Sequence, residues 1–76
     1  MTKQRSLVAV IDAITAIAPD LAPVLARTRT SALYAAPESA YLFWNETADA
    51  LQRHAGDHPK AVEIAAIFAG KAGPQA

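Results

Sequence analysis

The sequence predicts an all-α protein, folded as a compact bundle of four short helices. Apolar residues recur at helical spacing in four successive segments, and no segment alternates apolar with polar residues as a strand would. Prolines and glycines separate these segments at intervals that suit short helices. We expect helices at about residues 3–18, 20–34, 37–55 and 58–69, in a single helical domain over 1–70 that is followed by a flexible tail over 71–76.

The first expected helix carries one apolar stripe. Thr2 is a suitable N-cap, and Pro19 stops the helix because the residue before a proline disfavours helical geometry. The stripe consists of Leu7, Val10, Ile11, Ile14, Ile17 and Ala18.

The second expected helix begins with Asp20 as its N-cap and tolerates Pro23 in its first turn. Its weakest part is the run of threonine, serine and arginine over 27–31, because threonine and serine lower helix propensity. The helix can therefore end anywhere from Thr30 to Ala35. Its apolar face consists of Leu21, Val24, Leu25, Thr28 and Ala32.

Turn residues set the limits of the last two helices. Pro37 suits the first position of the third helix, Glu38 complements the helix dipole, and Gly56 fits a C-terminal cap. In the fourth helix, Asp57 is the expected N-cap and Gly70 follows the last residue.

The third helix opens with four large, mostly apolar residues in a row, Tyr41, Leu42, Phe43 and Trp44. At ~100° per residue they sweep most of the way round a helix and cannot share one face. Trp44 falls on the core stripe, and Tyr41 and Phe43 fall on its two flanks. Leu42 falls on the most polar stripe of the chain, which also holds Asn45, Glu46, Asp49 and Arg53.

Two interpretations of Leu42 stay open. A single apolar residue on a surface is common and needs no explanation. Alternatively, a second chain covers the start of this helix, which the enrichment of aromatic residues at interfaces favours. On that interpretation the partner-binding residues are Tyr41, Leu42, Phe43, Glu46 and Asp49.

The small size of the chain favours association. A domain of 76 residues rarely holds more than ~3–5 kcal/mol of stability without a disulfide, a metal or a partner, and this chain has no cysteine. Much of its 53% hydrophobic content is alanine, which buries little surface. The fourth helix also has few polar positions for a helix on the surface of a monomer. We expect a homodimer, a complex with another protein, or both.

One cluster has the residue types of a metal or acid–base site, namely His54, Asp57, His58 and Glu63. Gly56 and Pro59 break the helix between the two histidines, so they cannot chelate a metal from one helix face. No nucleophile or phosphate-binding loop accompanies them. We expect a turn with exposed histidines, no metal or other cofactor, and no enzymatic activity.

Arg27 and Arg29 form a possible anion-binding site with the neighbouring hydroxyl groups. Together with Lys60 they could contact a DNA backbone in a small transcriptional regulator. The net charge of zero and the acidic residues of the third helix, however, make nucleic acid a poor partner.

The apolar run near the N-terminus is too short to span a bilayer, and Asp12 interrupts it. We expect a cytoplasmic protein without a membrane partner. Its size and composition are typical of small bacterial or phage proteins that act as adaptors, inhibitors or antitoxin-like regulators by binding another protein. The alternatives are a DNA-binding regulator and a sensor that holds a small ligand between its helices.

Overall fold

The computed structural model describes residues 6–70, and within them the chain forms four α-helices, two 3-10 turns and no strand. The all-α bundle predicted from the sequence is confirmed. The predicted tail over 71–76 lies outside the described residues. In chain order the elements are α1 (Leu7–Ile17), a 3-10 turn over Pro19–Leu21, α2 (Ala22–Tyr34), a 3-10 turn over Pro37–Ser39, α3 (Ala40–Ala55) and α4 (Ala61–Ala69).

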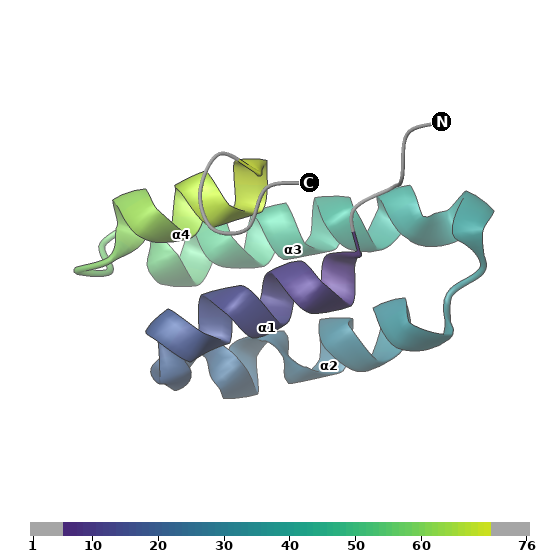
Figure 1. Cartoon of the computed structure of the whole chain (residues 1–76), viewed down its shortest axis with the longest axis horizontal. Coiled ribbons are helices and arrows are strands. Elements are labelled where there is room, and N and C mark those ends of the chain that lie inside the picture. The colour runs from purple at the N-terminus through teal and green to yellow at the C-terminus, as the bar shows by residue number, and fades with distance from the viewer. Residues whose placement is uncertain (1–5, 71–76) are drawn as a thin grey trace.

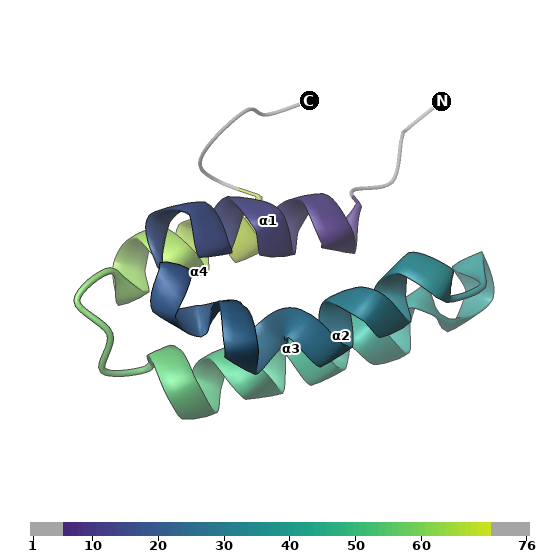
Figure 2. The ribbon, with the colours of Figure 1, turned by 90° about the horizontal axis from the view of Figure 1, so that it is seen from below.

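The helices pack as two layers (Figures 1 and 2). α2 and α3 form an antiparallel hairpin, and α1 and α4 pack together against it. In both views the turn between α2 and α3 extends beyond α1 and α4. Within residues 6–70, therefore, no helix of the second layer covers this end of the hairpin.

The core lies between the two layers. The apolar stripe predicted for the first helix supplies most of it, although Ile17 is only half-buried. Ile14 and Leu25 are completely enclosed. The buried apolar side chains of the described residues are Leu7, Val10, Ile11, Ile14, Ala18, Leu21, Leu25, Ala55 and Ile64.

Two buried threonines are satisfied by local and interhelical hydrogen bonds. The Thr47 hydroxyl donates to the Phe43 carbonyl at 2.7 Å, one turn earlier in α3. The Thr28 hydroxyl donates to Oε1 of Glu46 at 3.0 Å and so links α2 to α3. No side-chain nitrogen or oxygen buried within the described residues lacks a partner, which removes a large potential cost of placing hydroxyls in a core.

The first two helices begin later than predicted. α1 begins at Leu7, and the Ser6 hydroxyl caps it by accepting from the Ala9 amide at 3.3 Å; Thr2 lies outside the described residues. Asp20 does not cap α2. It lies in the 3-10 turn, and its carboxylate faces His58 instead. This contact is formed by a residue 38 positions away, which a local capping rule cannot anticipate.

The last two helices also begin later than predicted. Pro37 opens a 3-10 turn rather than α3 itself. Asp57 does not cap α4, which begins at Ala61 after Lys60. Gly56 follows α3 as predicted but keeps a right-handed φ of −59°, whereas Gly70 ends α4 with a φ of 77° that suits glycine.

The sequence predicts an exposed His58, but this prediction is wrong. The His58 side chain is only 12% exposed. Its Nδ1 accepts the Lys60 amide at 3.0 Å, so the neutral ring carries its proton on Nε2, which lies 3.1 Å from the Asp20 carboxylate. The imidazole thus links the turn before α4 to the turn before α2.

Within residues 6–70, no helix is both long and apolar enough to cross a membrane.

Candidate functional site

An exposed apolar surface lies at the end of the α2–α3 hairpin. Five large apolar side chains are exposed in residues 6–70, and four of them lie within ten residues of one another around this turn. They are Leu33 at 53%, Tyr34 at 81%, Tyr41 at 62% and Leu42 at 51% exposure. We call these four residues the tip patch. The fifth, Val62 at 84%, lies on α4.

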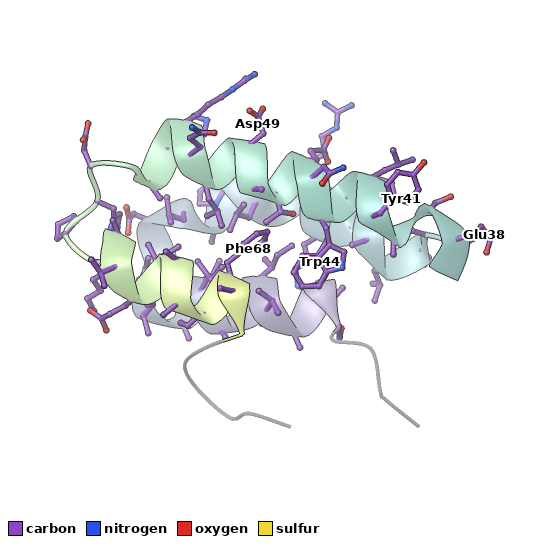
Figure 3. The ribbon with its side chains drawn as sticks, turned by 90° about the horizontal axis from the view of Figure 1, so that it is seen from above. Glu38, Tyr41, Trp44, Asp49 and Phe68 are labelled. Atoms are coloured by element: carbon purple, nitrogen blue, oxygen red, sulfur yellow. The ribbon has the colours of Figure 1, made fainter. Side chains whose placement is uncertain are left out.

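The four consecutive large residues of α3 divide between the patch and the core. Figure 3 shows Tyr41 and Asp49 on the outer side of α3 and Trp44 on the inner side, toward Phe68 of α4. The Trp44 and Phe68 rings lie 5.4 Å apart between centroids at 60°, within the range of favourable tilted aromatic pairs. The predicted core position of Trp44 is confirmed, although its ring is only half-buried.

The other predicted partner-binding residues of α3 do not all reach the surface. Leu42, Glu46 and Asp49 are exposed together on the polar stripe, as the helical spacing indicated. Phe43 is half-buried and packs against the core, so much of its ring is unavailable to a partner.

Sequence reasoning missed Leu33 and Tyr34. The signal was present, because both residues follow polar stripes of α2 in the same way that Leu42 follows a polar stripe of α3. Tyr34 shares its side of the helix with Arg27, Thr30 and Ser31 at helical spacing. The predicted helix over 20–34 ends where α2 ends, at Tyr34. The prediction did not assign the exposed end of this helix to a binding surface.

Two acids, Glu38 and Glu46, lie next to the tip patch in the sequence, and residues 30–52 contain no Lys, Arg or His. The third acid of this segment, Asp49, follows Leu42 by seven residues, as far as Arg27 precedes Tyr34. Glu46 is held in place by the Thr28 hydroxyl at 3.0 Å. Asp49 pairs with Arg53 at 3.1 Å, so its charge is partly compensated.

The two arginines proposed for anion binding are not equivalent. Arg29 donates from Nε and Nη2 to the Asp12 carboxylate at 2.7 and 3.2 Å. This pairing lowers the pKa of Asp12, chiefly through the hydrogen bond, and raises the pKa of Arg29. Arg27 is exposed. Because Arg29 is already engaged with Asp12, the structure does not assemble a two-arginine site, and the DNA-binding alternative loses one of its three cations.

The histidine-containing turn has no assembled ligand set. Within residues 6–70 no group of three or more His, Asp or Glu side chains lies close enough to hold a metal ion. His54 is exposed, and His58 is engaged with Asp20. The His58 hydrogen bond lowers the pKa of Asp20.

A second apolar feature is an open groove of about 340 Å³ between α3 and α4. Gln52 supplies the one polar side chain among its lining residues. The lining consists of Ala48, Leu51, Gln52, Ala55, Gly56, Ala61, Ile64, Ala65 and Phe68. Binding pockets usually combine an apolar lining with several convergent polar groups that orient the ligand, and this groove offers few.

Comparison of the chain with protein-family models, curated proteins and solved structures finds no match.

Proposed function

We propose that this protein is a small, non-enzymatic binding module that recognises another protein through the tip patch. The observation that carries the proposal is that Leu33, Tyr34, Tyr41 and Leu42 are all exposed within residues 6–70 and flank the turn between α2 and α3. A single exposed apolar residue is ordinary, whereas several large ones concentrated at one end of a molecule favour an interaction site. Two tyrosines add to this, because tyrosine is enriched among the residues that dominate binding energy.

The tip patch is available for binding because its four side chains are not part of the hydrophobic core. Its side chains project from helices that are already fixed by the core, so a partner would meet a surface that is largely formed beforehand. A surface formed in advance lowers the entropic cost of association. In such a module, adaptor, inhibitor and antitoxin-like regulator are all roles that act through one protein contact.

The test compares three baits in the native host: the wild type, Leu42→Glu and Val62→Glu. Val62 is a matched control, because it is an exposed apolar residue on α4 that lies away from the tip patch. We expect a partner to be captured by the wild type and by Val62→Glu but not by Leu42→Glu, since a charge placed in an apolar interface loses its hydration. Identical capture by all three baits, or loss with Val62→Glu alone, would refute the proposal.

A small apolar ligand in the α3–α4 groove is the second candidate function. It is supported by the apolar lining of the groove and its opening to solvent. A fluorescent apolar dye distinguishes the two candidates. Dye binding that is lost in Ala65→Trp and retained in Leu42→Glu would favour the groove, because Ala65 lines the groove and Leu42 does not.

A further inference from the structure

We propose that the tip patch takes a cationic amphipathic segment of its partner, in which apolar side chains are bordered by lysine or arginine. This inference rests on the proposed function and adds the chemistry of the partner. It is carried by two features found together: four exposed large apolar side chains at the hairpin end, and acidic residues around them without a basic residue from 30 to 52.

The acids lie close enough to the patch to act on whatever covers it. Glu46 follows Leu42 by four residues, so it is the next side chain along the same face of α3. Glu38 lies at the hairpin end itself and is exposed (Figure 3). Separations of one helical turn are within the screening length of ~8 Å at physiological salt, so these charges contribute to binding there.

Glu46 is also held in a fixed position. The Thr28 hydroxyl, which is buried in α2, donates to Oε1 of Glu46 at 3.0 Å. A carboxylate fixed by the fold loses less conformational freedom when a cation binds than a free side chain would. The second carboxylate oxygen of Glu46 can accept from a guanidinium or ammonium group of the partner.

The nearest cationic side chains do not neutralise the negative charge of Glu38 and Glu46. Arg29 is engaged with Asp12 at 2.7 Å, and Arg53 with Asp49 at 3.1 Å. Arg27 is exposed, but it precedes Tyr34 by seven residues, or about 10 Å along the axis of α2. Among the described residues, Glu38 and Glu46 form no ion pair with Lys, Arg or His.

The negative charges of Glu38 and Glu46 also favour some binding partners of the tip patch over others. A nucleic acid or an anionic lipid surface would be repelled by the acids that border the patch. A second copy of this chain, placed patch to patch about a two-fold axis, would bring the Glu38 and Glu46 carboxylates of both copies into one interface, with no basic residue of 30–52 to compensate them. Like charges facing one another across an interface oppose association. A separate, basic partner avoids both costs.

The experiment titrates the full-length protein with three synthetic amphipathic peptides of about 18 residues, or five helical turns. All three carry leucine at i, i+3, i+4 and i+7 positions, and they differ only in the residues that border the leucines: lysine, glutamine or glutamate. The wild type is compared with Leu42→Glu, Glu38→Lys and Glu63→Lys. Glu63→Lys makes the same change of charge on α4, at the opposite end of the molecule, and is the matched control.

We expect the lysine peptide to bind the wild type at least about tenfold more tightly than the glutamate peptide, with an affinity that falls as salt is added. Glu38→Lys should weaken binding of the lysine peptide about fivefold, Glu63→Lys should leave it unchanged, and Leu42→Glu should abolish it.

The contradictory results separate this inference from the proposed function. If all three peptides bind equally and Leu42→Glu abolishes all of them, the patch binds polypeptide without charge preference, and only the cationic inference fails. The cationic inference also fails if no peptide binds, or if Glu63→Lys weakens binding as much as Glu38→Lys. If the lysine peptide binds Leu42→Glu as well as the wild type, the patch is not the site, and both proposals fail. If light scattering shows that Leu42→Glu halves the mass of the wild type, the occupant is a second copy.

Discussion

Arg29 of α2 holds the Asp12 carboxylate of α1 through two hydrogen bonds, from Nε at 2.7 Å and from Nη2 at 3.2 Å. The planar guanidinium matches the two carboxylate oxygens, which gives the contact a defined geometry. It joins the two layers of the bundle at their surface. It also engages one of the two arginines that the sequence suggested for anion binding, although the Arg29 side chain stays 41% exposed.

The Asp12–Arg29 pair predicts a specific dependence of stability on pH. The folded-state pKa of Asp12 lies below its unfolded value. The ionised carboxylate therefore stabilises the fold above the unfolded pKa of about 4, and this contribution is lost as the pH falls through the folded value. The difference in Tm between the wild type and Asp12→Asn should be largest near pH 7 and should shrink below about pH 4. Asp57→Asn, which changes an exposed carboxylate outside these pairs, should leave Tm unchanged at pH 7. A difference in Tm between the wild type and Asp12→Asn that stays constant with pH would contradict a stabilising role for the ionised Asp12 carboxylate.

The His58 contacts predict a tautomer. Because Nδ1 accepts the Lys60 amide, the neutral ring must carry its proton on Nε2, facing Asp20. Nitrogen-15 NMR of the histidine rings should show the Nε2–H form for neutral His58. His54, which is exposed, supplies an internal reference. An Nδ1–H tautomer would show that the Lys60 contact is not formed in solution.

Removal of the His58 ring should loosen both turns at once. His58→Ala leaves the Lys60 amide and the Asp20 carboxylate without this partner, and we expect a loss of about 1–2 kcal/mol. In a domain of this size that corresponds to a fall in Tm of roughly 5–10 °C by calorimetry. His54→Ala is the matched control and should change Tm little. Equal effects of the two substitutions would show that the buried contacts of His58 contribute nothing specific.

Local periodicity predicted the parts of the fold that depend on local sequence. The stripe from Leu7 to Ala18 is buried except for Ile17, which is half-buried, and the helix ends at Pro19 and Gly70 lie where expected, because each depends on residues within one or two turns. The Asp20–His58 contact could not be predicted in this way. It exists only because the fold brings together two turns that are 38 residues apart. Asp20 does not cap α2 because it lies inside the 3-10 turn, and the N-cap position is held by Leu21.

The candidate site was predicted in part. Helical geometry placed Leu42 on the polar stripe and Trp44 on the core stripe, and both placements are confirmed. It also predicted that the second helix reaches Tyr34, but binding was considered only for the third helix, so Leu33 and Tyr34 were not predicted as part of the same surface. Nor could it fix how deeply Phe43 is buried, because that depends on the packing of the neighbouring helices.

Trp44 and Tyr41 should respond differently to truncation. Trp44 packs against Phe68, and Trp44→Ala should cost about 3 kcal/mol, the low end for a tryptophan because the ring is half-buried. That is most of the ~3–5 kcal/mol available to so small a domain, so the variant should be largely unfolded by circular dichroism. Tyr41→Ala, which truncates a residue that is 62% exposed, should remain folded with a nearly unchanged Tm. Unfolding of Tyr41→Ala would show that the patch stabilises the monomer itself.

The most direct measurement of the central claim is site-specific photo-crosslinking in the native host, with p-benzoylphenylalanine placed at position 41 or at position 62. Tyr41 belongs to the tip patch, and Val62 is a comparably exposed residue on α4. If the protein acts by binding a partner at the hairpin end, irradiation should give a discrete adduct with another protein from position 41 and none from position 62. An adduct from position 62 alone, or equal adducts from both positions, would contradict the account.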